Sequence, residues 1–145
     1  MKISDILANG RPTVSFEFFP PKDDLGFWDL YKTIESLKPL APSYVSVTYG
    51  AAGSTRRKTV ELVKRIKNDA GIECMAHLTC GGATREEIQG VLDDLQAARM
   101  DNVLALRGDP PQGESKFVPT PGGFRYANEL VEFIRSRYRF CVGAA

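Results

Sequence analysis

The segment TVSFEFFPPKDD, residues 13–24, decides the fold class, because a strand pattern is followed there by two prolines instead of a glycine-rich turn. Alternating side chains place Glu17 on the opposite face of this strand from Val14 and Phe16. In a doubly wound sheet, the turn after the first strand ordinarily carries the glycines of a nucleotide site. This segment contains no glycine, and a barrel of parallel strands is therefore favoured.

Four further segments rich in β-forming residues follow at intervals of about thirty residues, the length of one βα unit. They begin at residues 44, 72, 102 and 140. The stretches between them have helical periodicity. The clearest helix starts with Thr84 and Glu87 in a capping box and carries an apolar stripe at helical spacing, formed by Ile88, Val91, Leu92 and Leu95. This alternation predicts an α/β fold with a parallel sheet and helical crossovers.

Polar or ionisable residues close each of the first four strands. They are Glu17, then Thr48, then His77 with Thr79, and finally Arg107 with Asp109. A (β/α)8 barrel, or TIM barrel, places its functional groups at these carboxyl ends. The alternation also puts Arg107 on the face shared by Val103 and Ala105, which we expect to be the face of the mouth.

The length of the chain sets an expectation about its domain organisation. A (β/α)8 barrel has eight strands and typically ~250 residues, whereas this sequence of 145 residues offers four complete units and stops in a fifth strand. We therefore expect residues 1–145 to be the amino-terminal portion of one barrel domain, with about the first four and a half βα units.

Composition points to a small-molecule partner. The chain is 43% hydrophobic and 26% charged, and its formal net charge is +1 with acids and bases interspersed. This pattern has no footprint for nucleic acid or for an anionic membrane surface. No run reaches the roughly 18 apolar residues that span a bilayer. Three cysteines without a Cys-x-x-Cys pair suit reduced thiols, and we expect a cytoplasmic protein.

One pattern invites a metal-site interpretation. In CMAHLTC, residues 74–80, two cysteines flank the histidine at even spacing. Strand alternation sends the thiols of Cys74 and Cys80 to one face and the imidazole of His77 to the other. Zinc requires converging ligands, so the sequence predicts no metal site.

The candidate site residues each have a structural alternative. A buried Glu17 is either hydrogen-bonded, neutral or facing a ligand, and a structural pairing with a buried arginine would also explain it. His77 is either catalytic or a core histidine that a backbone carbonyl satisfies. Gly108 lets the backbone approach a ligand between Arg107 and Asp109, but these two charges are also compatible with a plain salt bridge.

Two loops complete the candidate site. The segment GAAGST, residues 50–55, offers glycines before a helix start and suits phosphate or ribose oxygens, although an ordinary capped loop explains it equally well. The glycine- and proline-rich segment 110–124 is longer than an ordinary βα connection. We expect it to form a lid or a wall of the binding site.

Several of these stretches together resemble one family. SFEFFPPK, YVSVTYGAAGSTR, AHLTC, LALRGDPP and YANELV occur in the order and spacing of methylenetetrahydrofolate reductase, over essentially the whole chain. The resemblance implies a (β/α)8 barrel that binds FAD, takes hydride from NADH or NADPH and reduces 5,10-methylenetetrahydrofolate to 5-methyltetrahydrofolate, as a homo-oligomer in the full-length protein. The alternative is a truncated, inactive fragment or assembly module without tightly bound FAD.

The resemblance also implies roles for individual residues. Glu17 would be the general acid that protonates a folate ring nitrogen, aided by the neighbouring phenylalanines that favour its protonated form. Asp109 would lie between flavin and folate. The positions that match flavin-contacting residues are Thr48, Tyr49, Ala51, His77, Arg107, Gly108, Tyr126 and Ala127. Ala52 replaces a glycine that the family usually has, which adds a Cβ to the loop.

Overall fold

A computed structural model describes residues 1–145 except 22, 50–55, 111–112 and 114–115. Its centre is a five-stranded parallel sheet in which the spatial order of the strands, β1-β2-β3-β4-β5, is their order in the chain. The strands are β1 (Ser15–Phe18), β2 (Tyr44–Val47), β3 (Cys74–Thr79), β4 (Asn102–Leu106) and β5 (Cys141–Ala144).

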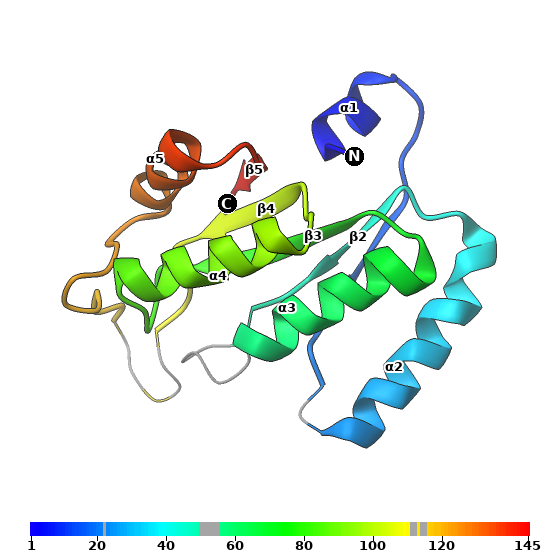
Figure 1. The fold of residues 1–145 in the computed structure, drawn as a ribbon, viewed down its shortest axis with the longest axis horizontal. Coiled ribbons are helices and arrows are strands. Elements are labelled where there is room, and N and C mark those ends of the chain that lie inside the picture. The colour runs from blue at the N-terminus through cyan, green and yellow to red at the C-terminus, as the bar shows by residue number, and fades with distance from the viewer. Residues whose placement is uncertain (22, 50–55, 111–112, 114–115) are drawn as a thin grey trace.

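Helices alternate with these strands along the chain (Figure 1). The α-helices are α1 (Ile3–Ala8), α2 (Asp24–Leu37), α3 (Arg56–Arg65), α4 (Arg85–Ala97) and α5 (Ala127–Arg137). Two short segments extend α2 and α3, namely η1 (Lys38–Leu40) and η3 (Ile66–Ala70). No helix in the described part of the chain is both long and apolar enough to cross a bilayer.

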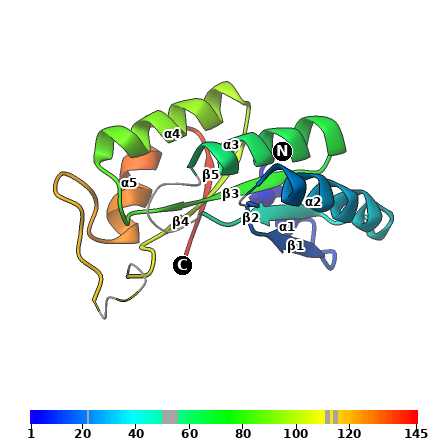
Figure 2. The same ribbon diagram turned by 90° about the horizontal axis from the view of Figure 1, so that it is seen from below.

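The helices α2 to α5 pack on one face of the sheet. Side chains at matched register positions of β2, β3 and β4 point to this face and are at most 1% exposed, among them Val47, Ala76 and Val103. They form one core with fully buried residues of all four helices, namely Ile34, Leu62, Val63, Ile88, Leu92, Leu130 and Ile134. Figure 2 shows the sheet edge-on with α3 and α4 lying over this face.

The winding of the sheet distinguishes the two parallel architectures. A doubly wound sheet reverses its strand order and carries helices on both faces. Here the order never reverses and the four helices share one core on one face, as in a (β/α)8 barrel. The predicted α/β fold with barrel-type winding is confirmed for the part of the chain that the structure describes.

Local sequence signals fix the ends of the helices. The hydroxyl of Thr84 accepts a hydrogen bond from the amide of Glu87, and the Glu87 carboxylate accepts one from the amide of Thr84. The predicted capping box is therefore present. The helical segment that includes η3 stops at Gly71, whose φ of +71° is the left-handed conformation that glycine adopts readily.

A polar cluster closes the amino ends of β3 and β4. The Lys67 ammonium lies 3.2 Å from a carboxylate oxygen of Glu73 and 2.7 Å from one of Asp101. The side chain of Asn102 is 1% exposed, donates to Glu73 and accepts from the amide of Ile3. This cluster ties the first residues and α1 to the sheet, at the end opposite the predicted site.

Candidate active site

The carboxyl ends of the strands bring Glu17, Ser46 and His77 together. Glu17 pairs in register with Ser46 on β2, so both side chains lie on the sheet face away from the helices. The Ser46 hydroxyl donates to Glu17 Oε2 at 3.1 Å, and His77 Nε2 lies 3.4 Å from the same oxygen. The predicted meeting of strand side chains at one mouth is confirmed for Glu17 and His77, whereas Ser46 was not predicted as a site residue.

His77 is buried while Glu17 is open to solvent. The side chain of His77 is 8% exposed and that of Glu17 is 51% exposed. Burial lowers the pKa of the His77 imidazole below its usual value, and the negative charge of Glu17 offsets part of that shift. The imidazole is therefore neutral near pH 7, and the adjacent carboxylate is the charge that acts on it.

The predicted shielding of Glu17 by phenylalanines is wrong. Phe16 and Phe18 lie on the opposite face of β1 and pack toward the helices, where Phe18 is 8% exposed. Phe19 shares the side of Glu17 but is 73% exposed. The groups that contact the carboxylate are instead polar, namely Ser46 and His77.

The end of β2 holds the next two predicted residues. The amide of Thr48 donates to the carbonyl of Phe18 at 2.9 Å, and its carbonyl accepts from the hydroxyl of Thr59 on α3 at 3.3 Å. Tyr49 is 8% exposed and belongs to the core. Ala51 and the rest of the predicted phosphate loop, residues 50–55, lie outside the described residues.

The strand face predicted for Arg107 is wrong. Register pairs His77 with Leu104 and Thr79 with Leu106. On β4, the mouth face is therefore the one that carries Leu104 and Leu106. Val103 and Ala105 point to the helices and are fully buried. Arg107 follows the end of the strand, is exposed, and lies with its guanidinium carbon 5.3 Å from the ring centroid of Phe117. No salt bridge joins Arg107 to Asp109 in the described part of the chain.

The backbone at Gly108 passes close to a neighbouring side chain. Its φ is +88°, and a Cβ built there would lie 3.1 Å from the Cβ of Thr79. The backbone just after β4 therefore passes directly against the end of β3, at Thr79. Asp109 follows it and is exposed on the same rim.

A pocket of about 540 Å³ opens where the connection from β4 to α5 begins and ends. Its described lining includes three cations and two aromatic rings, but no acid: Arg107, Lys116, Arg125, Phe117 and Tyr126, with Pro110 and Pro119. Tyr126 is the residue before α5, and Ala127 is the first residue of that helix. The sequence indicated a wall here, whereas Lys116, Phe117 and Arg125 were not predicted as site residues.

This connection is fixed to the neighbouring turn between β3 and α4. The amide of Arg85 donates to the carbonyl of Gly122 at 3.0 Å. A Cβ at Gly123 would lie 2.4 Å from the carbonyl oxygen of Ala83, so only glycine fits there. The described end of this connection is thus packed against the turn between β3 and α4.

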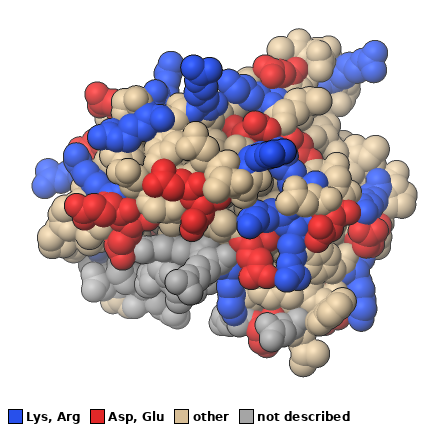
Figure 3. Space-filling view, viewed as in Figure 1, with Lys and Arg blue, Asp and Glu red and all other residues tan. Residues whose placement is uncertain are grey.

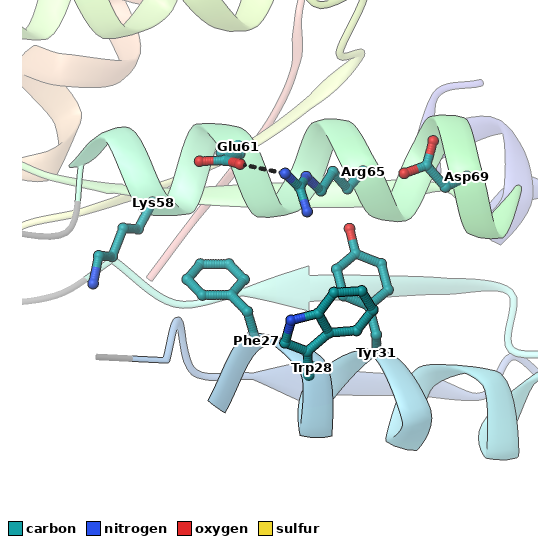
Figure 4. Close-up of a pocket in the computed structure, with 7 residues that line it drawn as sticks. All are labelled: Phe27, Trp28, Tyr31, Lys58, Glu61, Arg65 and Asp69. Carbon is teal, nitrogen blue, oxygen red and sulfur yellow. Dashed lines mark ion pairs between the residues drawn. The ribbon is translucent and has the colours of Figure 1, made fainter. Parts of the chain in front are cut away.

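A second pocket, of about 610 Å³, lies between α2 and α3 (Figure 4). Three rings of α2 face charged side chains of the α3 segment; the lining comprises Phe27, Trp28, Tyr31, Lys58, Glu61, Arg65 and Asp69. Arg65 is already paired with Glu61 at 2.8 Å. Every lining residue lies in a helical segment and none at a strand end, so this pocket is separate from the mouth.

The cysteines do not converge with the histidine. Cys74 pairs in register with Val45 on the helix-covered face, whereas His77 lies on the mouth face. Burial raises the pKa of the Cys80 thiol to about 11 and that of Cys74 further still. Both thiols are therefore protonated near pH 7.

On the helix-covered face of the molecule, acidic and basic side chains are interspersed (Figure 3).

Comparisons with known proteins agree on one family. The family model described as methylenetetrahydrofolate reductase matches residues 2–145. Methylenetetrahydrofolate reductase (NADH) 1 of Arabidopsis thaliana is 42% identical over 137 residues, which are 94% of this chain and 23% of that protein. Methylenetetrahydrofolate reductase 1 of Schizosaccharomyces pombe is 39% identical over 152 positions, covering 100% of this chain and 25% of that protein.

A bacterial relative covers more of its own length. The 5,10-methylenetetrahydrofolate reductase of Pectobacterium carotovorum subsp. carotovorum is 38% identical over 136 residues, which are 94% of this chain and 44% of that protein. The chain thus spans less than half the length of each of these relatives. The family-model match, residues 2–145, includes all the strand ends described above.

Proposed function

Because the chain belongs to the methylenetetrahydrofolate reductase family, we propose that residues 1–145 supply the amino-terminal part of a barrel that reduces 5,10-methylenetetrahydrofolate to 5-methyltetrahydrofolate with NADH or NADPH. The observation that carries this proposal is the meeting of Glu17 with Ser46 and His77 at the mouth. It supplies an oriented carboxyl group at the end of the barrel where such folds hold their substrates.

Glu17 acts in this proposal as the general acid. It donates a proton to a folate ring nitrogen, and the methylene bridge opens to an iminium carbon that accepts hydride. The exposed carboxyl group can reach a ligand at the mouth without any movement of the sheet. A positioned acid of this kind typically contributes 10²–10⁴-fold to the rate.

The residues at the mouth fit a flavin dinucleotide. The pocket next to Arg107 offers cations for phosphates and rings for stacking. We assign FAD contacts to Thr48, Tyr49, Ala51, His77, Arg107, Gly108, Tyr126 and Ala127. When bound, the flavin carries hydride from the nicotinamide to the folate. Asp109, on the same rim, orients the pterin and places a negative charge near the flavin.

Substitution of the acid tests the proposed function. In protein that contains residues 1–145, Glu17→Gln should lower the rate of methylenetetrahydrofolate reduction by at least about a hundredfold. Its visible flavin absorbance and its rate of reduction by NADH or NADPH should remain, because neither step needs this proton. Glu132→Gln, at an exposed position of α5, is the matched control and should leave all three measurements unchanged.

The alternative function is an assembly module that shares the ancestry of the family without tight FAD binding. Protein of this length that purifies without flavin colour and takes up no added FAD would favour the module. Turnover that is unaffected by Glu17→Gln would reject the proposed acid.

A further inference from the structure

Two different groups lie beside one carboxylate oxygen of Glu17, and one of them, Ser46, forms a hydrogen bond to it. Ser46 Oγ donates to Oε2 at 3.1 Å, and His77 Nε2 lies 3.4 Å from that same atom. The side chain is nonetheless 51% exposed, and no contact of the other oxygen, Oε1, occurs among the described residues. The two carboxylate oxygens therefore have different surroundings, one anchored and one open.

The contact between Glu17 and His77 crosses an entire strand. Glu17 lies on β1 and His77 on β3, with β2 between them. Neighbouring strands are about 4.8 Å apart, so β1 and β3 are separated by roughly twice that distance. Register places Met75 level with Glu17, and His77 is two residues nearer to the carboxyl end. The side chain of Glu17 reaches across β2 toward this imidazole.

The Nε2 atom of His77 has no alternative partner. It is sealed from solvent and forms no hydrogen bond of good geometry among the described residues. Its neighbours on the same face are uncharged, with Ser46 and Thr48 on β2 and Leu104 at the matching position of β4. Among the described residues, Glu17 is thus the one charged group that shifts the pKa of this imidazole.

We propose that Ser46 and His77 are positioning residues for Glu17, which hold Oε2 and leave Oε1 to deliver the proton. In this arrangement the neutral imidazole carries its proton on Nε2 and donates it toward Oε2, alongside the Ser46 hydroxyl. The carboxyl proton then belongs on Oε1, the oxygen without a partner among the described residues. The delivery step depends on the proposed function, whereas the anchoring of Oε2 does not.

The first experiment requires no substrate. Long-range ¹H–¹⁵N spectra of the full chain, recorded through a pH titration, should show the proton on Nε2 in the neutral form of His77. Glu17→Gln keeps the size of the side chain but removes its charge, and should lower the pKa of His77 further. Glu132→Gln should leave that pKa unchanged. A neutral ring protonated only on Nδ1, or a His77 pKa that ignores Glu17→Gln, would overturn the proposal.

The second experiment separates positioning from packing. Ser46→Ala removes the donor, whereas Ser46→Thr keeps the hydroxyl. In the active holoenzyme, Ser46→Ala should lower kcat about tenfold with little change in KM, and Ser46→Thr should restore most of it. An equal loss in both variants would indicate that Ser46 acts only through packing and would refute its positioning role.

The two readouts distinguish failure of this inference from failure of the proposed function. If the titration shows His77 coupled to Glu17 while methylenetetrahydrofolate is not reduced, the anchoring holds and the proposed substrate is wrong. If reduction occurs and depends on Glu17 while His77 titrates independently of it, the proposed function holds and the positioning role is wrong.

Discussion

Gly108 offers the sharpest test of the mouth geometry, through its replacement by alanine. The residue combines two constraints: a φ of +88° and a predicted Cβ distance of 3.1 Å to Thr79. A left-handed conformation costs an L-residue roughly 1–2 kcal/mol. Alanine recovers about 0.4–1 kcal/mol of this by restricting the unfolded chain. The contact with Thr79 adds about 1–3 kcal/mol, as overpacking generally does.

Gly113 provides a matched control, since its φ is +94° but nothing lies within 4 Å of a Cβ built there. Gly113→Ala should therefore cost about 1 kcal/mol, from backbone strain alone. Gly108→Ala should cost about 3 kcal/mol. Urea unfolding of the full chain, followed by circular dichroism, measures both. The difference of about 2 kcal/mol is roughly a 30-fold change in the unfolding equilibrium.

The comparison at Gly108 decides whether the close approach of this residue to Thr79 affects the free energy of unfolding. Equal losses for Gly108→Ala and Gly113→Ala would show that strain explains everything and that the contact is relieved without cost. Because Gly108 is also an assigned flavin contact, its alanine variant should bind FAD more weakly than Gly113→Ala. This comparison uses flavin fluorescence at matched folded fractions.

Three further predictions concern pH and capping. The pKa of His77 is lowered in the folded chain, so the unfolded chain binds a proton on this imidazole more readily. The urea midpoint of unfolding should therefore fall as the pH drops below about 6.5. A midpoint that depends equally on pH in His77→Gln would contradict this assignment. The hydrogen bond from Lys67 lowers the pKa of Asp101. Asp101→Asn should therefore reduce the free energy of unfolding by about 0.5 kcal/mol at pH 7, a small value because the Asp101 side chain is 40% exposed and screened. This loss should vanish below the pKa of Asp101 in the folded chain, and urea unfolding at pH 7 and at strongly acidic pH tests it. Thr84→Ala should lower the free energy of unfolding by about 1 kcal/mol, because the helix cap is lost. Thr33→Ala, on the exposed side of α2, is the control and should change it by less than about 0.5 kcal/mol. Equal effects of the two substitutions in urea unfolding would argue against the capping box.

The sequence was sufficient where side-chain contrast was strong. The stripe from Ile88 to Leu95 defined α4, and the Thr84 capping box defined its start, because both signals are local. Glu17 and His77 met as expected because each stands at the end of a strand in a sheet whose winding follows chain order. These predictions required only the strand period and the parallel direction.

The sequence was insufficient where the two faces of an element do not differ in polarity. In β4 both faces are apolar, with Val103 and Ala105 on one and Leu104 and Leu106 on the other, so alternation could not identify the mouth face. The pattern around Glu17 assigned that residue to a face but could not say what contacts it. Lys116 and Arg125 lie in an irregular connection, where no periodicity marks a shared pocket.

The hydrogen bond between Ser46 and Glu17 links the surroundings of the proposed acid to the register of β1 and β2. A slip of β2 by one residue would bring Val45 or Val47 under the carboxylate and turn the serine into the apolar layer. The misaligned sheet would remove the hydroxyl that donates to Glu17 and bury it among apolar side chains in the same event. Under the proposed function, a chain that folds with this wrong alignment would also lose its activity.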